Sequence, residues 1–342
     1  MTLEEFLDTW HSPSETLLVH TSGSTGTPKP MLVEKRRMLN SAKITCDFLG
    51  LKPGDAALLC MSLDYIAGKM MVVRSIERSL KLISVKPSGH PLSAESLKNA
   101  NDAAWKQGIT FTAMVPMQVY NTLQVPEERE RLTHIKHLLI GGGAIDSALE
   151  AELRSLSGDI AIWSTYGMTE TLSHIALRRI NGKEASEWYQ PFDSVKVSQT
   201  EEGCLVIDAP LVCKQPLVTN DIVEIQPYIY NKVCAEGVRF RIKGRKDNVI
   251  CSGGIKIQIE EVENLLKPHL QKPFMLAKKK DEKFGEIAVL LTEDGDLKKV
   301  EATVRRLLSD NSKKYWIPRE YIHVESLPLT ETGKPKRACL LR

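Results

Sequence analysis

A stretch of hydroxyl groups, glycines and a lysine near the start of the chain has the composition of a phosphate-binding loop. It reads TSGSTGTPK and spans residues 21–29, between the apolar runs 17–19 and 31–33. Glycines permit close backbone approach to a ligand, hydroxyl groups donate hydrogen bonds, and Lys29 supplies a point charge. The spacing does not fit GxxxxGK[ST], so this is not an ordinary P-loop. A plain turn between two strands is the alternative.

A second polar group, STYGMTE at residues 164–170, could hold a nucleotide and its metal ion. Tyr166 offers a flat face for adenine, and Gly167 leaves room beside it. Thr169 can donate to the α-phosphate, and Glu170 can bind a Mg²⁺ that bridges the phosphates of ATP, since Mg²⁺ favours one or two carboxylates plus substrate oxygens. A core tyrosine and a glutamate that complements a helix dipole are the alternatives.

Two further charged residues are candidates for the ribose. Asp221 follows an apolar run and could accept both ribose hydroxyls, as acidic residues do in other nucleotide sites. Arg245 could reach the same ribose or the phosphate. A surface ion pair is the alternative for either residue.

The elements that position these residues alternate between strands and helices up to about residue 165. Short apolar runs are expected as strands at 56–61, 80–85, 109–115, 135–140 and 160–164. Apolar residues from Met38 to Leu49 recur at helical spacing and stop at Gly50. This alternation predicts a largely parallel sheet with helices on its faces.

After residue 192 the sequence pattern changes from alternating strands and helices to strands alone. A hairpin with Glu-Gly at its turn is predicted within 194–207, and VRFRI should place Val238, Phe240 and Ile242 inward and its two arginines outward. After residue 247 we expect a small α+β unit with helices near 258–266 and 296–308. The predicted domains are therefore 1–246 and 247–342.

Composition limits the partners of the protein. The net charge of +3 is too small to argue for nucleic acid, and no apolar run approaches a membrane span. Seven unpatterned cysteines and an acidic N-terminus indicate reduced thiols and no signal peptide, so we expect a cytoplasmic protein without membrane insertion. Small molecules are the expected partners, and a homodimer is left open.

The motifs together resemble those of the adenylate-forming (acyl-CoA ligase, AMP-binding) superfamily. TSGSTGTPK resembles its phosphate loop, GGGAI (141–145) its adenine-side loop, and STYGMTE its Tyr-Gly-x-Thr-Glu motif. TND (219–221), GRKDNVICSGGIKIQIEEVE (244–263) and LPLTETGKPKR (327–337) resemble later motifs, in the order of the family. The ordered matches span residues 21 to 337, which makes the resemblance specific.

The resemblance implies a role for each matched residue, with ATP, Mg²⁺ and coenzyme A as cofactor and co-substrates. Catalytic roles fall on Lys334, Thr169 and Glu170, and Glu170 is also the metal ligand. The residues implied to bind ATP or AMP are Thr21, Ser22, Gly23, Ser24, Thr25, Gly26, Lys29, Gly142, Gly143, Ala144, Tyr166, Gly167, Asp221 and Arg245. Asp247 is implied as a hinge, and Gly253 and Gly254 as the loop that serves the thiol step.

The implied chemistry has two steps. A carboxylate attacks the α-phosphate of ATP to give an acyl-adenylate and pyrophosphate, with Lys334 bridging the attacking carboxylate and the phosphate. The mobile C-terminal domain then turns about Asp247, and the thiol of coenzyme A attacks the acyl group.

The chain departs from most of the family in having only 20 residues before the phosphate loop, so the resemblance implies the adenylate-forming fold without most of its usual N-terminal region. The short o-succinylbenzoate–CoA ligases of menaquinone synthesis are the most similar group, through CMSLDYIAGKMMVVRSI (60–76). Tyr65 stands where those ligases have His, Gln258 where many relatives have Pro, and Asn220 where many have Gly. The candidates for the acid pocket are Tyr65, Lys69, Arg74, Ser164 and Thr165.

Three hypotheses follow. The leading one is o-succinylbenzoate–CoA ligase activity, and the second is a CoA ligase or carrier-protein-loading enzyme for another aryl or acyl carboxylic acid. The third is a truncated, non-catalytic nucleotide-binding homologue, and the joint presence of Lys29, Glu170, Asp221, Arg245 and Lys334 argues against it.

Overall fold

A computed structural model describes residues 1–20, 29–100, 105–106, 108–156, 160–229, 236–309 and 313–328. By their internal contacts the residues divide into two compact units. Unit 1 comprises 1–198, 206–217 and 226–240, and unit 2 comprises 199–205, 218–225 and the described residues from 241 onward. The predicted division into a large domain, 1–246, and a mobile C-terminal domain, 247–342, stays a prediction.

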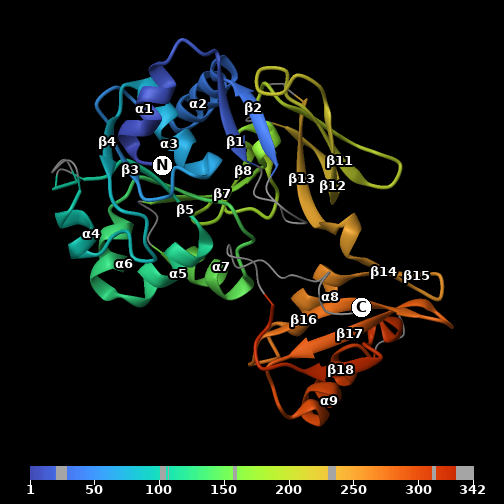
Figure 1. Cartoon of the computed structure of the whole chain (residues 1–342). Coiled ribbons are helices and arrows are strands. Elements are labelled where there is room, and N and C mark those ends of the chain that lie inside the picture. Colours follow the sequence, from blue (N-terminus) through green and yellow to red (C-terminus); the bar gives the residue numbers. More distant parts are fainter. Residues whose placement is uncertain are drawn as a thin grey trace. The chain divides into compact units, whose positions relative to one another are not determined.

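Unit 1 is built on a seven-stranded sheet (Figure 1). Its strands, in spatial order, are β4 (Lys81–Ser84), β3 (Ala56–Leu59), β5 (Phe111–Met114), β6 (His137–Ile140), β7 (Ala161–Gly167), β8 (His174–Arg179) and β9 (Gln190–Pro191). The strands from β4 to β7 are parallel, and β8 and β9 are antiparallel to their neighbours. The predicted parallel sheet is confirmed.

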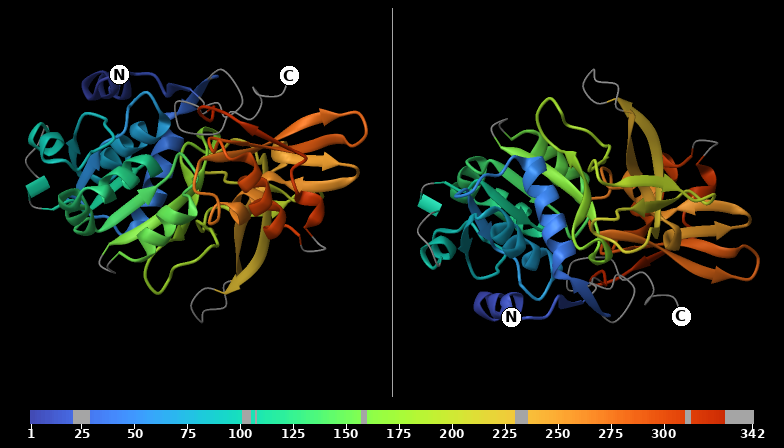
Figure 2. Two further views of the ribbon diagram at one scale, coloured as in Figure 1. Left: turned by 90° about the horizontal axis from the view of Figure 1, so that it is seen from below. Right: turned by 90° about the horizontal axis from the view of Figure 1, so that it is seen from above.

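Helices cover both faces of this sheet (Figures 1 and 2). They are α1 (Leu3–His11), α2 (Lys35–Leu49) and α3 (Ile66–Arg78) on one side, and α4 (Ala94–Lys98), α5 (Pro116–Gln124), α6 (Pro126–Thr133) and α7 (Ser147–Arg154) on the other. Helix α2 ends as predicted, because Gly50 adopts a left-handed conformation at φ 63°. On the α4–α7 side, Leu58, Leu138 and Ile162 of the sheet share a buried apolar core with Leu149 and Leu153 of α7.

Two smaller sheets accompany the large one. The hairpin β1 (Thr16–His20) and β2 (Pro30–Glu34) is antiparallel, with Leu17, Val19 and Val33 on its buried face. A four-stranded sheet has the order β10 (Lys196–Gln199), β11 (Cys204–Asp208), β12 (Leu217–Ile229) and β13 (Glu236–Arg245). The predicted hairpin in 194–207 is confirmed, with Gly203 at φ 82° in its turn.

The predicted alternation in VRFRI is wrong. Only Phe240 is buried, at 0% exposed, whereas Val238 and Ile242 are 37% and 40% exposed. Arg239, expected outward, packs its guanidinium over the rings of Trp188 and Tyr228 instead. Alternation correctly identified a strand, but of the three residues expected inward only Phe240 is buried, where it packs against the rings of Tyr166 and Tyr189.

Unit 2 carries a five-stranded sheet with helices, as expected for a small α+β unit. Its elements are β14 (Val249–Ser252), β15 (Ile255–Gln258), α8 (Ile259–Leu266), β16 (Phe274–Asp281), β17 (Gly285–Thr292), α9 (Leu297–Leu307) and β18 (Glu320–His323). Val262 of α8 and Val300 and Val304 of α9 pack on Leu276 and Leu290 of the sheet.

Candidate active site

The loops that carry most of the unit 1 candidates follow the carboxyl ends of its parallel strands. Tyr65 follows β3 and begins α3, residues 141–145 follow β6, and Tyr166 and Gly167 end β7. The carboxyl ends of parallel strands meet at one edge of a sheet, which is where open α/β proteins bind ligands. The fold therefore brings these candidates to a common edge.

The glycine-rich loop 141–145 is packed closely against β7. A Cβ atom added to Gly141 would lie 2.3 Å from Oγ1 of Thr165, so any other residue there would require the Thr165 side chain to shift. Gly142 has a φ of 79°, and the loop leads into α7, whose first turn is capped by Asp146. The Asp146 carboxylate accepts hydrogen bonds from the amides of Ala148 and Leu149, each at 2.9 Å. Gly142, Gly143 and Ala144 thus lie in a loop whose two ends are fixed.

Tyr166 sits in an aromatic cluster. Its ring is 7% exposed and meets Phe240 edge to face at a centroid distance of 5.1 Å. Tyr189 lies 5.9 Å from Tyr166 and stacks on Phe240. These contacts fix the orientation of the Tyr166 ring, and its stacking against adenine stays a prediction.

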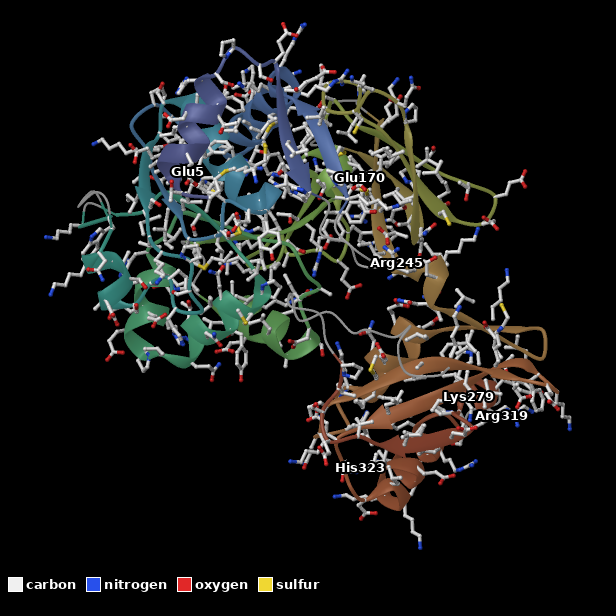
Figure 3. The ribbon with its side chains drawn as sticks, viewed as in Figure 1. Glu5, Glu170, Arg245, Lys279, Arg319 and His323 are labelled. Carbon is white, nitrogen blue, oxygen red and sulfur yellow. The ribbon has the colours of Figure 1, made fainter. Side chains whose placement is uncertain are left out.

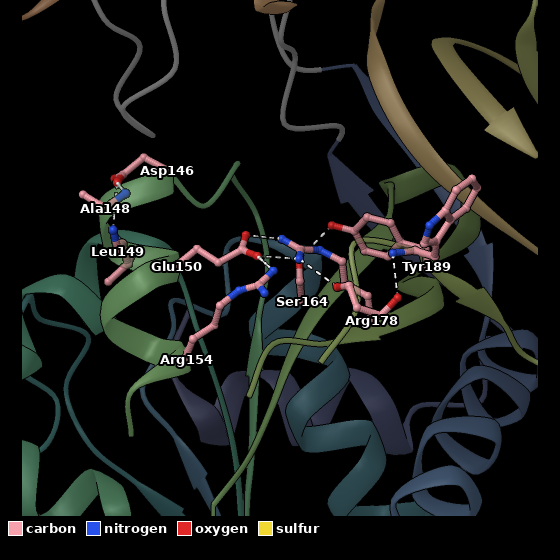
Figure 4. A network of polar contacts seen from close by, with 10 residues as sticks. Asp146, Ala148, Leu149, Glu150, Arg154, Ser164, Arg178 and Tyr189 are labelled. Carbon is pink, nitrogen blue, oxygen red and sulfur yellow. Dashed lines mark hydrogen bonds and ion pairs between the residues drawn. The ribbon is translucent and has the colours of Figure 1, made fainter. Parts of the chain in front are cut away.

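Ser164 belongs to a polar network that the sequence did not reveal (Figure 4). Its hydroxyl lies 2.7 Å from the Tyr189 hydroxyl, and the Arg178 guanidinium lies over the Tyr189 ring. Arg178 donates to both carboxylate oxygens of Glu150, and Arg154 donates to one of them. Burial opposes ionisation of Glu150, but the arginine hydrogen bonds outweigh it and lower its pKa to about 2.

Arg178, Glu150 and Tyr189 were missed because nothing in their spacing resembles a motif. A sequence signal was nonetheless present, since Arg178 directly follows the apolar run Ile175–Leu177, and in the structure its side chain is only 10% exposed. A charged residue held this far inside needs a partner. The partner could not be named from the sequence because it comes from α7.

Thr169 and Glu170 begin a short 3₁₀ turn, Thr169–Thr171, directly after β7. Thr169 is buried, whereas Glu170 is exposed on unit 1 (Figure 3). In the described residues no group of three or more histidine, cysteine or acidic side chains could hold a metal ion. A single exposed carboxylate fits Mg²⁺ well, because this ion takes most of its ligands from phosphates and water.

The three candidates for the acid pocket on α3 differ in their surroundings. Tyr65 is 45% exposed. Lys69 is 3% exposed, and its ammonium donates to the carbonyl oxygens of Leu63 and Asp64 at 2.5 and 3.3 Å. Lys69 therefore holds the loop that carries Tyr65, and burial lowers the pKa of its amine.

Arg74 is a buried cation with few partners. It is 2% exposed, one Nη donates to the Ser173 hydroxyl, and the other lies 4.0 Å from the Met71 sulfur. Its buried Nε has no hydrogen-bond partner, and no described carboxylate forms an ion pair with it. Burial lowers the pKa of Arg74 to about 10, so the side chain is still charged at neutral pH.

Unit 2 brings the TND and GRKD motifs together. Arg245 donates to Asp221 at 3.2 Å and to Asp247 at 2.8 Å, and its position is labelled in Figure 3. Asn220 donates to both oxygens of Asp247. The ribose candidates and the predicted hinge residue are thus neighbours.

The predicted thiol-step loop is a tight turn between β14 and β15. Gly253 and Gly254 have φ values of 57° and 85°, a pair of conformations that two-residue hairpins favour. The Gly253 amide donates to the Phe284 carbonyl at 2.8 Å, which ties the turn to the loop before β17.

Several predicted residues lie outside the described part of the chain. They are Thr21, Ser22, Gly23, Ser24, Thr25, Gly26 and Lys334. Lys29 is described, exposed and directly precedes β2.

Residues 8–208 match the family described as AMP-binding enzyme. The chain belongs to this family. The resemblance to the adenylate-forming superfamily is thereby confirmed, and so is the predicted fold class.

Individual relatives are similar over nearly the whole chain. It is 23% identical to a 2-succinylbenzoate–CoA ligase of Bacillus mycoides (strain KBAB4), over 97% of this chain and 71% of that protein. It is 25% identical to a component of the plipastatin synthase of Bacillus subtilis (strain 168), over 94% of this chain but only 13% of that much longer protein. The family match and the CoA ligase relatives support the predicted class, an acid–CoA ligase.

Solved structures of the AMP-binding family share the fold. An acyl-CoA synthetase (AMP-forming)/AMP-acid ligase II-like protein from Dyadobacter fermentans is 32% identical, with a TM-score of 0.61 over 97% of this chain and 91% of that chain. The o-succinylbenzoate coenzyme A synthetase of Bacillus subtilis has a TM-score of 0.71 at 22% identity, over 94% of this chain and 68% of that chain. In the described part of this chain no helix is long and apolar enough to cross a bilayer.

Proposed function

We propose that the protein is an ATP-dependent carboxylate–CoA ligase that acts through an acyl-adenylate. The leading acid is o-succinylbenzoate, converted to o-succinylbenzoyl-CoA for menaquinone biosynthesis. The relatives named 2-succinylbenzoate–CoA ligase support this acid, as do the structural neighbours named for the same synthetase.

The observation that carries the proposal is the unneutralised charge of Arg74. A guanidinium that is 2% exposed and lacks a carboxylate partner among the described residues is costly, because it has lost water without gaining a counter-ion. An acid with two carboxylates supplies that counter-ion, since one carboxylate can bind Arg74 while the other reacts. Lys69 is less suited to this role because its ammonium already serves two backbone carbonyls.

In the first step a carboxylate oxygen attacks the α-phosphorus of ATP, the bond to the bridging oxygen breaks, and pyrophosphate leaves. Mg²⁺ held by Glu170 would neutralise the phosphate charge. Thr169 and the phosphate loop orient the α-phosphate, and Lys334 spans the attacking carboxylate and the phosphate as negative charge builds between them. Asp221 accepts from the ribose hydroxyls, with Arg245 beside it.

In the second step the sulfur of coenzyme A attacks the acyl carbon and AMP leaves. A turn of the chain at Asp247 would exchange Lys334 for the loop at Gly253 and Gly254. That turn would break the hydrogen bonds of Asp247 to Asn220 and Arg245. These contacts would therefore be present in only one of the two conformations, before or after the turn.

The test is pyrophosphate release with ATP across a panel of acids, with and without coenzyme A. We expect o-succinylbenzoate to be used ~10²-fold or more better than benzoate or octanoate, because a monocarboxylate leaves Arg74 unpaired. Arg74→Met should reduce this preference while leaving the KM for ATP nearly unchanged. Equal use of benzoate or octanoate by the unmodified enzyme would overturn the choice of acid but not the class of reaction.

A second candidate acceptor is a carrier-protein thiol, which the similarity to the plipastatin synthase favours. The same panel distinguishes the two acceptors. Thioester formation with coenzyme A supports the ligase, whereas adenylation without transfer to coenzyme A supports a carrier-protein acceptor.

A further inference from the structure

A chain of buried hydrogen bonds leads away from Arg74. The Arg74 guanidinium donates to Ser173 Oγ at 2.5 Å, and Ser173 Oγ lies 3.1 Å from Nδ1 of His174. Nε2 of His174 lies 3.0 Å from Thr45 Oγ1, which donates to the Ser41 carbonyl at 3.1 Å. The chain thus joins α3, β8 and α2 across the interior of unit 1. His174 is 9% exposed, and Thr45 is fully buried.

The directions of these hydrogen bonds follow from the two ends of the chain together with a neutral ring. Thr45 donates to a carbonyl, so its oxygen accepts a proton from Nε2 of His174. A neutral His174 is then the tautomer protonated on Nε2, with Nδ1 as an acceptor. Arg74 can only donate, so Ser173 Oγ accepts from it and gives its own proton to Nδ1. Burial and the charge of Arg74 both lower the pKa of His174, which agrees with a neutral ring.

A proton on Nδ1 would turn a donor toward Ser173 Oγ, which could accept it through its second lone pair. The serine proton would then lose its acceptor on His174 and would no longer be held away from the Arg74 guanidinium. The chain thus keeps a lone pair of Ser173 Oγ directed toward the Arg74 guanidinium. Ser173 is also close to the Tyr-Gly motif, because a Cβ on Gly167 would lie 2.2 Å from the Ser173 carbonyl oxygen.

We propose that His174 is a positioning residue for the acid substrate. Through Ser173 it fixes one Nη of the Arg74 guanidinium, which leaves the Nε–H group, without a hydrogen-bond partner in the described part of the chain, for the carboxylate that does not react. This inference rests on the proposed role of Arg74 in acid recognition. His174 itself touches neither the acid nor ATP.

The test compares His174→Phe, His174→Asn and Arg74→Met in acid-dependent pyrophosphate release. His174→Phe keeps a ring of similar size against Phe192, which contacts the imidazole, but removes both nitrogens. We expect roughly a tenfold rise in the KM for o-succinylbenzoate, the effect of one lost buried hydrogen bond, with the KM for ATP unchanged. In His174→Asn the amide oxygen can still accept from Ser173, so this variant should recover part of the loss.

His137→Phe is the matched control. His137 is a histidine of strand β6, which is separated from β8 by β7 in the same sheet, and its two buried ring nitrogens have no hydrogen-bond partner among the described residues. Its replacement measures the general effect of exchanging a buried histidine. We expect no change in the preference for dicarboxylates over monocarboxylates in this control.

A double substitution separates the proposed role of Arg74 in acid recognition from the proposed role of His174 in positioning Arg74. If His174 acts through Arg74, then His174→Phe should change acid preference no further when Arg74 is already Met. An Arg74→Met enzyme with unaltered acid preference would overturn the proposed role of Arg74 in acid recognition, and with it the role of His174, but not the class of reaction. An altered preference in Arg74→Met together with an unaltered KM in His174→Phe would overturn the role of His174 alone.

A direct readout comes from nitrogen NMR of the histidine-labelled protein. His174 should show a protonated Nε2 and an unprotonated Nδ1. A ring protonated on Nδ1, or on both nitrogens, contradicts the proposed chain whatever the activity data show.

Discussion

Arg178 and Glu150 meet at two points, with guanidinium nitrogens 2.6 and 2.9 Å from the two carboxylate oxygens. Their side chains are only 10% and 16% exposed, so the pair is partly withdrawn from water. Glu150 belongs to the helix after the glycine loop, and Arg178 lies opposite Ser164 in the strand register. This one contact joins helix α7, which follows the glycine-rich loop 141–145, to strand β8, which pairs with the strand of Tyr166.

The first prediction concerns this ion pair. Glu150→Gln removes the charge opposite a poorly exposed arginine, and we expect the free energy of unfolding to fall by about 2–3 kcal/mol. Because the pKa of Glu150 in the folded protein lies near 2, below the ordinary 4.5, its contribution is complete above pH 4.5 and is lost as the pH falls toward 2. Denaturant unfolding near pH 6 and near pH 3 measures both effects. A variant whose stability falls with pH as steeply as that of the unmodified protein would contradict the assignment.

The second prediction concerns the approach of Gly167 to the chain that follows it. A Cβ atom at this position would lie 2.2 Å from the Ser173 carbonyl oxygen and 2.5 Å from the His174 Cα, and backbone atoms cannot move aside easily. We expect Gly167→Ala to lower the free energy of unfolding by about 1–3 kcal/mol and to impair ATP use. Gly295→Ala is the control, because no atom lies within 4 Å of the added methyl group. Equal midpoints for the two variants in denaturant would refute this reasoning.

The third prediction concerns the metal ligand. Glu170→Gln should raise the Mg²⁺ concentration needed for pyrophosphate release while leaving the melting temperature nearly unchanged, because the side chain is exposed. Glu127→Gln, at an exposed position in the first turn of α6, serves as the control. Full activity of Glu170→Gln at limiting Mg²⁺ would exclude Glu170 as the ligand.

The fourth prediction separates the two half-reactions. Lys334→Ala should lower the rate of pyrophosphate release by ~10²–10³, because the lost charge matters mainly in the transition state. Supplied with preformed acyl-adenylate, the same variant should still form the CoA thioester. Single-turnover assays measure each step, and Lys336→Ala tests whether any lysine of this segment has the same effect. Equal damage to both steps would argue for one fixed active arrangement.

Asp247→Pro is the complementary variant. Proline holds φ near −65°, so the chain at this point could not reach a second conformation. We expect thioester formation to suffer more than adenylation, the reverse of Lys334→Ala.

The sequence predicted the parallel sheet well because its signals are local. Apolar runs such as 135–140 mark buried strands, and Gly50 marks the end of α2 where the backbone needs a positive φ. The strand at 238–242 was also identified, but not the exposure of its residues. Burial there depends on rings at positions 166 and 189, which are far away in the sequence.

Site prediction also identified candidates within local motifs only, and not contacts between distant elements. Asp221 and Arg245, predicted from two separate motifs, lie together in unit 2, and their roles stay predictions. The chain from Arg74 through His174 to Thr45 was not foreseen, because it joins three elements by single hydrogen bonds. Periodicity and motif spacing describe one element at a time and carry no information about such contacts.

The chain passes between the two compact units five times, at 198/199, 205/206, 217/218, 225/226 and 240/241. A turn at Asp247 would lie beyond the last of these passages. The part that rotates would then be shorter than compact unit 2, and residues 199–205, 218–225 and 241–246 would stay behind. An engineer who wishes to exchange the C-terminal part with that of a relative should therefore join the sequences at 247, because a junction at 240/241 would pair newly introduced strand residues with old ones in the middle of a sheet.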